Sequence, residues 1–283
     1  MEINKVKNKK KREKRVIPGF GISMGVTLAL LSLIILIPMA SIIISASGLT
    51  FNEFIRIVSA KDVVSGYKVS FLCAFIAALI NCIFGIILAW VLVKYDFPLK
   101  GFIDGLIELP FALPTSVAGI ALTSLYSDKG WIGSIFAKAG IKIAYTKIGI
   151  IIAMIFIGIP FVVRAIQPVL EKMDKQYEEA AAMLGASEKR TFFKVILPEI
   201  FPAMLTGFGL AFARAIGEYG SVVFIAGNIP YETQIAPLLI MTKLEQFKYT
   251  DATAIALVML VSSFAILLFV NMIQVRVNKI TNN

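Results

Sequence analysis

Two oppositely charged residues, Arg214 and Glu218, lie within an otherwise apolar stretch of the sequence. A charge in the middle of a hydrophobic span costs about 2.5 to 3.5 kcal/mol on insertion scales, so such residues need a structural or functional reason. Spaced four apart on a helix, the two share one face and can neutralise each other. We therefore predict an ion pair that either fixes how its helix packs or helps an anion to cross.

Apart from this pair, the sequence contains no group of residues that is typical of a catalytic site. It contains no histidine, which removes the usual metal ligand and the commonest base near neutral pH. It also lacks a Gly-x-x-x-x-Gly-Lys-Ser/Thr loop that would hold nucleotide phosphates. Cys73 and Cys82 share one apolar run, too far apart along a helix for a disulfide. We expect no catalytic residue, no metal site and no cofactor in this chain.

The composition is that of a membrane protein. Hydrophobic residues make up 58% of the 283 and charged residues 16%, whereas a soluble domain is about half apolar and about a quarter charged. Several apolar runs have the length of about twenty residues that a helix needs to cross the hydrocarbon core. We predict an all-α protein in the lipid bilayer of the cell membrane with six transmembrane helices. The predicted spans are residues 20–44, 70–93, 102–126, 148–166, 199–227 and 253–275.

The distribution of basic residues predicts the orientation of these spans. Eight Lys and Arg crowd residues 1–15. Such a run can bind nucleic acid, but here it directly precedes an apolar stretch, so we interpret residues 1–17 as a basic cytoplasmic tail with no nucleic-acid partner. Inner segments then hold more Lys and Arg than outer ones. Residues 18–283 would form the transmembrane domain, with both termini in the cytoplasm.

The third predicted span, residues 102–126, carries two carboxylates. Asp104 and Glu108 lie four apart near its inner start, where two like charges on one helix face repel each other. We interpret this as a position at the membrane surface, close to Lys94 and Lys100.

The same span contains two prolines one turn apart, Pro110 and Pro114. Each removes a backbone donor and must bend or break the helix. Irregular backbone at membrane depth is tolerated only where protein or a water-filled cavity covers it. The prolines therefore indicate either a packing kink or a gate in a transport pathway.

The longest inner segment, residues 167–198, does not look like a passive linker. Residues 176–184 are rich in Ala, Glu, Met and Leu, which favour a short helix. Gly185 stands where a left-handed residue would end that helix. Ser187 can cap a second short helix, which Pro198 would close. The segment predicts a helix, a sharp turn and a second helix on the cytoplasmic side.

This segment presents a mixed surface that suits docking to another protein. Phe192, Phe193 and Val195 offer apolar contact. The charged residues around them are Glu178, Glu179, Lys189 and Arg190. The alternative is an amphipathic loop whose apolar residues dip into the membrane interface.

The residues of this segment also form a recognisable pattern. Its fixed positions are Glu179, Ala180, Ala181, Gly185, Val195, Leu197 and Pro198. In residue type and spacing they resemble the cytoplasmic loop of ABC importer permeases. The resemblance implies a type I ABC importer permease architecture, in which residues 167–198 are the coupling loop held by a cytoplasmic ATPase dimer. Hydrolysis of ATP would then take place on that partner.

Two further stretches narrow the family. Residues 109–122 look like the third span of sulfate and molybdate permeases, and residues 212–228 resemble the sulfate/thiosulfate T-type subunit more closely. The likeness runs from about residue 18 to the end of the chain. It implies import of sulfate or thiosulfate. The partners would be a homologous second permease subunit and a sulfate-binding protein that is extracellular or periplasmic.

Two alternatives stay open at this point. A molybdate or tungstate ABC permease is the nearer one, because the two substrate groups share the pattern of the third span. A secondary anion transporter is the other. It would need internal symmetry or a relay of ionisable residues in the spans, and we find neither in the sequence.

Overall fold

The computed structural model describes residues 20–281, with side chains described through residue 276. Within this range all regular secondary structure is helical, as predicted. The chain divides into two compact units, Met1–Gly48 and Leu49–Asn283. Among the described residues, five helices are long and apolar enough to cross a membrane. They are Phe20–Ser47, Lys61–Lys94, Lys147–Lys172, Glu188–Ile216 and Tyr249–Arg276.

The described part of the first unit is one continuous apolar helix, Phe20–Ser47, that corresponds to the first predicted span. It consists of α1 (Phe20–Leu31), the π-helical turn η1 (Ser32–Leu36) and α2 (Ile37–Ser47). Pro38, which cannot donate a backbone hydrogen bond, is the second residue of α2. In the π turn before it, the Ile37 N–H donates to the Ser32 carbonyl. The wider turn accommodates the proline without ending the helix.

Three long helices form the centre of the second unit, and small residues let their backbones approach closely. The helices are α4 (Lys61–Lys94), α9 (Lys147–Lys172) and α12 (Leu197–Ile216). A Cβ atom added at Gly85 of α4 would lie 2.6 Å from Val162 Cγ1 of α9, and one added at Gly207 of α12 would lie 2.8 Å from Val162 Cα. Membrane helices associate through such close van der Waals packing, because lipid supplies no hydrophobic driving force between them.

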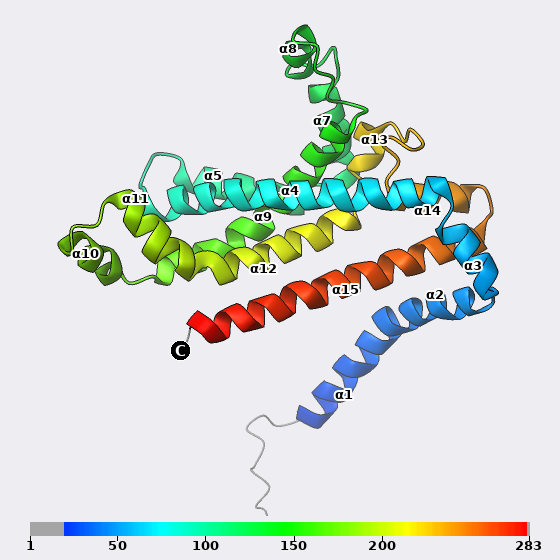
Figure 1. Ribbon diagram of the computed structural model, residues 1–283, viewed down its shortest axis with the longest axis horizontal. Helices are drawn as coiled ribbons and strands as arrows, with labels where there is room; N and C mark the ends of the chain where they lie inside the picture. The colour runs from blue at the N-terminus through cyan, green and yellow to red at the C-terminus, as the bar shows by residue number, and fades with distance from the viewer. Residues whose placement is uncertain (1–19, 282–283) are drawn as a thin grey trace, which may run out of the picture. The chain divides into compact units, whose positions relative to one another are not determined.

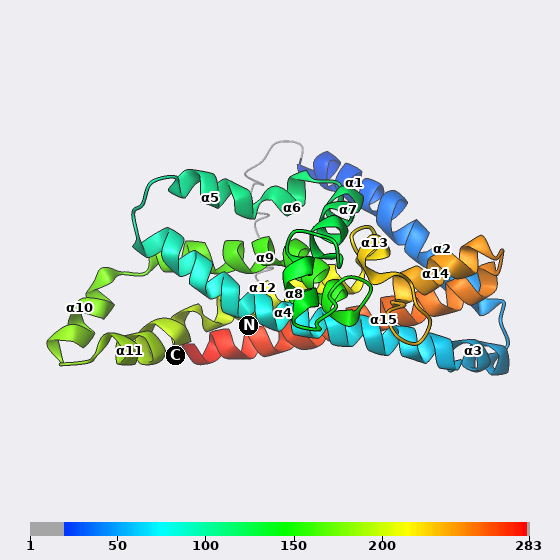
Figure 2. The same cartoon turned by 90° about the horizontal axis from the view of Figure 1, so that it is seen from above.

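Shorter helices lie at the two ends of this bundle (Figures 1 and 2). One end holds α3 (Phe51–Val58) and α14 (Ala236–Glu245), and the opposite end holds α10 (Lys175–Met183) and α11 (Glu188–Thr191). The last helix, α15 (Tyr249–Thr281), packs against α12 and α14. The N-terminus of α3 has a capping box, in which the Thr50 hydroxyl accepts from the Glu53 N–H and the Glu53 carboxylate accepts from the Thr50 N–H. The Thr50 hydroxyl also donates to this carboxylate, which lowers the pKa of Glu53.

The third predicted span, residues 102–126, is not one helix. It is divided into α5 (Lys100–Ile107), α6 (Leu109–Ala112) and α7 (Thr115–Tyr126), together called the proline-interrupted segment below. Pro110 lies in the first turn of α6, and Pro114 is the N-cap residue of α7. A proline is tolerated at the start of a helix and not in its interior. The chain therefore starts a new helix at each of the two prolines. From there α7 leads to α8 (Gly133–Lys138), across the direction of α4 (Figure 1).

The fifth predicted span, residues 199–227, differs at its end. Helix α12 ends at Ile216, and residues 217–221 separate it from the short helix α13 (Val222–Ala226). The prediction of one helix through residue 227 was wrong. Two glycines, Gly217 and Gly220, lie in this break, and glycine weakens a helix interior.

The start of this span corrects a second prediction, that Pro198 closes a separate helix. Instead α11, the π-helical turn η2 (Phe192–Ile196) and α12 continue as one helix through Pro198. The Leu197 N–H donates to the Phe192 carbonyl across the π turn, as Ile37 does before Pro38. A proline two residues after a wide turn is accommodated without ending the helix.

Candidate coupling segment and transport pathway

The segment between α9 and α12 folds as the predicted helix and sharp turn. Asp174 caps α10 by accepting a hydrogen bond from the Gln176 N–H at 3.0 Å. At its other end Gly185 has φ +76°, a conformation that costs other residues about 1–2 kcal/mol. The Ala186 N–H then donates to the Ala181 carbonyl at 3.0 Å, which satisfies one of the last carbonyls of the helix. Ser187 caps α11 by accepting from the Arg190 N–H.

The exposed apolar surface of this segment lies only in part where the sequence placed it, because Phe193 is exposed whereas Phe192 is half-buried. Phe192, predicted to be available for docking, packs edge-on against Trp90 of α4 with ring centroids 5.5 Å apart. The side chains that project instead are Tyr177, Met183 and Leu184, and the last two are 89% and 88% exposed. Sequence reasoning took Met183 and Leu184 only as helix formers. Their position beside the turn at Gly185 was the signal that could have identified them.

The predicted motif residues divide between this exposed surface and the body of the bundle. Glu179, Ala180, Gly185 and Pro198 are exposed, whereas Ala181, Val195 and Leu197 are half-buried. The Phe193 ring is also exposed and stacks edge-on against Phe192. The motif therefore combines a projecting turn with half-buried residues that pack against the bundle.

A second contact fixes α10 to the end of α4. The Lys94 ammonium, the last residue of α4, pairs with the Glu178 carboxylate in the first turn of α10. The same ammonium lies 5.4 Å from the centre of the Trp90 ring. Because Trp90 also contacts Phe192, the two sides of the turn share one anchoring point on α4.

The predicted ion pair between Arg214 and Glu218 is present. Arg214 Nη1 and Glu218 Oε2 are 2.5 Å apart, in the last turn of α12 and in the break that follows it. The Glu218 side chain is only 2% exposed, and its other oxygen accepts from the Ser221 N–H at 2.9 Å and the Ser221 hydroxyl at 3.1 Å. Glu218 thus holds the break between α12 and α13 together while it neutralises Arg214, whose side chain is 37% exposed.

This break lies directly against α7 of the proline-interrupted segment. A Cβ added at Gly119 of α7 would lie 2.5 Å from the Ser221 carbonyl oxygen, and one added at Gly220 would lie 2.1 Å from Thr115 Oγ1. The first half of α7, which follows the interruption at Pro114, and the break after Ile216 therefore pack closely against each other. Irregular backbone at membrane depth is found where protein or a cavity covers it, and here α7 covers the break.

Asp104 of α5 and Glu108, the residue that follows α5, are both held by an arginine that no pattern in the sequence identified. Arg164 of α9 places Nη1 2.7 Å from Asp104 Oδ1 and Nη2 2.8 Å from Glu108 Oε1. The expected neighbours of these carboxylates, Lys94 and Lys100, pair with Glu178 and Asp96 instead. Both carboxylates are partly exposed, Asp104 at 36% and Glu108 at 57%, so their position at the membrane surface stays a prediction, while their ion-pair partner is Arg164 and not a lysine. No local spacing predicts a contact between residues 60 positions apart.

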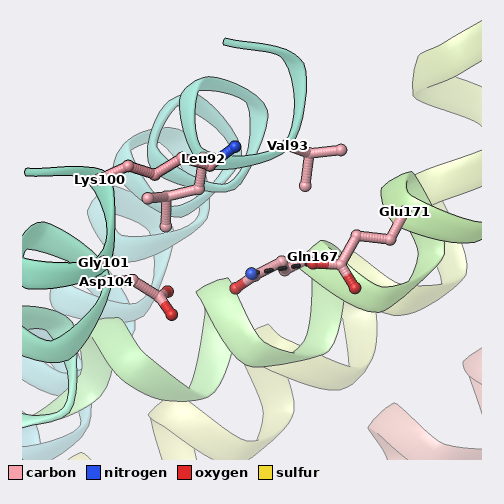
Figure 3. Close-up of a pocket in the computed structure, with 7 residues that line it drawn as sticks. All are labelled: Leu92, Val93, Lys100, Gly101, Asp104, Gln167 and Glu171. Carbon is pink, nitrogen blue, oxygen red and sulfur yellow. Dashed lines mark hydrogen bonds between the residues drawn. The ribbon is translucent and has the colours of Figure 1, made fainter. Parts of the chain in front are cut away.

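Beside this cluster a cavity of about 450 Å³ opens between α4, α5 and α9 (Figure 3). Asp104 from α5 and Gln167 from α9 reach toward the same space, and Gln167 is hydrogen-bonded to Glu171 one turn further along α9. The remaining lining residues are Leu92, Val93, Lys100 and Gly101. Acidic side chains outnumber basic ones on this lining, so the cavity does not favour an anion.

The arrangement of helices is that of an ABC importer permease. It matches a solved bacterial ABC transporter involved in import of the acidic polysaccharide alginate, with a TM-score of 0.75 over 91% of this chain and 96% of that chain at 15% identity. It also matches the MetNI methionine ABC transporter, with a TM-score of 0.56 over 76% of this chain and 95% of that chain at 15% identity. At these identities the likeness shows the fold.

The sequence shows the family. Residues 81–281 match the model of the binding-protein-dependent transport system inner membrane component, and the chain belongs to this family of multi-pass inner membrane permeases. It is a transport component of an ABC importer. The family description implies a binding protein and an ATPase as its partners.

Relatives within the family share nearly half of their residues with this chain. The sulfate transport system permease protein CysT of Salmonella typhimurium (strain LT2) is 45% identical over 93% of this chain and 95% of its own length. Its counterpart in Escherichia coli (strain K12) is 44% identical over the same shares. The probable sulfate transport system permease protein cysT of Chlorokybus atmophyticus is 51% identical over 88% of this chain and 87% of its own.

Proposed function

We propose that this chain is the membrane-spanning permease subunit through which an ATP-driven importer admits sulfate or thiosulfate. Six segments cross the membrane: the five long helices and the proline-interrupted segment. Both termini and α10 face the cytoplasm. The basic residues at the start of the chain support this orientation, because cytoplasmic segments of membrane proteins carry the excess of Lys and Arg.

Energy reaches the permease through α10 and the turn at Gly185. The observation that carries this proposal is the projecting end of α10, where the large apolar side chains of Met183 and Leu184 are almost fully exposed. Burial of a leucine side chain contributes about 1.5–3 kcal/mol, so two such residues provide an anchor for a partner. Glu179, also exposed, adds a charge beside them. The partner is a cytoplasmic ATPase dimer, one subunit of which holds α10.

The substrate assignment rests on the relatives and on the neutrality of the predicted pathway pair. The three relatives described above carry sulfate in their names, at 44–51% identity. Glu218 neutralises Arg214, so the pathway lacks a permanent strong anion site there, and an ion that binds weakly leaves quickly. A homologous second permease subunit completes the pathway, and an extracellular sulfate-binding protein delivers the ion.

Uptake of labelled sulfate tests this function directly. A strain that lacks this chain should lose uptake, and the restored chain should return it. Unlabelled thiosulfate should compete, whereas molybdate at the same concentration should leave uptake unchanged. Competition by molybdate stronger than that by thiosulfate would replace the sulfate assignment with the molybdate alternative.

A matched pair of variants tests the role of α10. Leu184→Asp places a charge on the projecting surface and should abolish co-purification of the ATPase as well as sulfate uptake. Phe247→Asp is the control, because Phe247 is 78% exposed at the opposite end of the bundle, beside α14. It should leave co-purification unchanged. Retention of the ATPase by the Leu184→Asp complex would contradict the proposal.

A further inference from the structure

Arg164 joins two parts of the molecule that the proposed function requires to move together. We propose that it is a positioning residue, which ties the proline-interrupted segment to α9 so that displacement of α10 reaches Pro110 and Pro114. The inference rests on the proposed function, because it presumes that α10 is displaced by an ATPase.

The guanidinium of Arg164 makes three contacts, two with Asp104 of α5 and one with Glu108, the residue that follows α5. Nη1 donates to Asp104 Oδ1 at 2.7 Å, while Nη2 lies 2.8 Å from Glu108 Oε1 and donates to the Asp104 carbonyl at 3.2 Å. The planar fork of arginine suits such a divided contact, which a lysine ammonium cannot reproduce. Arg164 therefore fixes both the position and the rotation of α5.

Little else holds α5 in place. Of its residues only Ile107 is buried, and Phe102, Ile103 and Leu106 are exposed. By contrast, the neighbouring face of α9 is anchored in the bundle through Val162, Val163 and Ile166, each of them fully buried. Because α5 contributes so few packed side chains, its link to α9 is chiefly the polar contact with Arg164.

A row of side-chain hydrogen bonds leads from Arg164 along α9 toward α10. Arg164 Nη1 also donates to Gln167 Oε1 at 2.6 Å, and Gln167 Nε2 donates to Glu171 Oε1 at 3.0 Å. This row of side chains passes Pro168, which has no N–H to donate to the Arg164 carbonyl one turn before it. The side-chain bonds thus bridge one of the two points at which an interior proline, Pro160 or Pro168, removes a backbone hydrogen bond from α9. Figure 3 shows Gln167 and Glu171 in this row, facing Asp104.

Beyond Glu171 the chain enters α10 almost at once. Helix α9 ends at Lys172, Met173 and Asp174 form the connection, and α10 begins at Lys175. A push on α10 therefore acts on the end of α9, from which the row of side chains leads back to Arg164 and across to α5. After α5 and α6 the chain reaches Pro114 and the start of α7. The start of α7 packs against the break that contains Ser221.

Sulfate transported per ATP hydrolysed, measured with the whole importer in proteoliposomes together with its binding protein, tests this link. Arg164→Gln should lower the ratio about tenfold, within the range of coupling changes produced by residues between distant sites. Arg164→Lys should give an intermediate ratio, because it keeps the charge and loses the fork. Asp104→Asn combined with Glu108→Gln should match Arg164→Gln, and all three changes together should lower the ratio no further, because they break one link.

A purely structural role predicts a different result. It would reduce the amount of assembled importer while each assembled complex still moved the same amount of sulfate per ATP, and this outcome would overturn the proposal. Where Arg164→Gln prevents assembly, the exchanged pair Arg164→Asp with Asp104→Arg restores opposite charges at the two positions. It should assemble with a ratio within about threefold of the original. Assembly with a ratio still about tenfold low would also overturn the proposal.

Failure of this inference can be told apart from failure of the proposed function. An unchanged ratio in Arg164→Gln, together with lost uptake in Leu184→Asp, would reject the link at Arg164 alone. Normal uptake in Leu184→Asp would instead reject α10 as the site at which energy enters.

Discussion

The ammonium of Lys94, at the end of α4, is paired with the carboxylate of Glu178 in the first turn of α10. The pair lies between one of the longest helices of the bundle and the short helix that we propose to receive the ATPase. It is partly exposed, with 21% of the Lys94 side chain and 30% of the Glu178 side chain accessible. Its position gives α10 a fixed distance from α4 before any partner binds.

Neutralising this pair should weaken transport without abolishing it. A partly exposed ion pair contributes up to about 1 kcal/mol, so Glu178→Gln should lower sulfate uptake by no more than about fivefold. The loss should shrink as the ionic strength rises, because salt screens the original pair. The exchanged variant Lys94→Glu with Glu178→Lys should recover most of the uptake. A drop far beyond fivefold would mean that Glu178 itself contacts the ATPase.

The turn at Gly185 should be sensitive to any side chain. Gly185→Ala puts a Cβ on a residue with φ +76°, at a cost of about 1–2 kcal/mol, although nothing lies within 4 Å of that position. We expect the ATPase to keep hydrolysing ATP while sulfate uptake falls, because the turn no longer holds its shape. Gly185→Asn should recover part of the uptake, since asparagine tolerates this conformation.

The loop between α8 and α9 supplies a matched control for this prediction. Gly140 has φ +74° and also has nothing within 4 Å of an added Cβ. Gly140→Ala therefore introduces the same backbone strain far from α10, between α8 and α9. It should leave the ratio of sulfate to ATP unchanged. Equal losses in both variants would show that strain alone, and not the turn beside α10, lowers uptake.

Local features of this protein were predictable from the sequence, and features that depend on distant contacts were not. The turn at Gly185 and the pair Arg214–Glu218 are set by residues at most five positions apart, so spacing and residue type identified them. The contact of Arg164 with Asp104 spans 60 positions and follows from the packing of α9 beside α5, which no local pattern encodes.

Of the predictions made at prolines, one was right and one was wrong, and the error has a related cause. Pro110 and Pro114 were recognised as helix breakers, and residues 102–126 are interrupted at both. Pro198 was taken as the end of a helix, since a proline ordinarily ends one. The π turn that carries the helix through Pro198 is stabilised in part by Phe192 against Trp90, a contact made only after folding.

Close packing between α7 and the break after α12 should not tolerate a methyl group. Gly119→Ala would bring a Cβ to 2.5 Å from the Ser221 carbonyl oxygen and 2.8 Å from Ser221 Cα, and backbone cannot move aside as a flexible side chain does. We expect destabilisation of about 1–3 kcal/mol, the usual cost of overpacking. Gly105→Ala on α5, with nothing within 4 Å, is the control and should not destabilise. Thermal unfolding of the detergent-solubilised importer measures both.

Substitutions at Arg214 and Glu218 should separate a packing role from a role in anion passage. Glu218 is buried and accepts from Arg214 and from Ser221, so Glu218→Ala leaves the Ser221 N–H unpaired and should destabilise the importer by about 1–3 kcal/mol. Arg214→Lys keeps the opposite charge, so we expect near-normal stability and an unchanged KM for sulfate. A KM raised about tenfold at normal stability would show that the guanidinium fork contacts the ion, because a packing role does not alter substrate affinity.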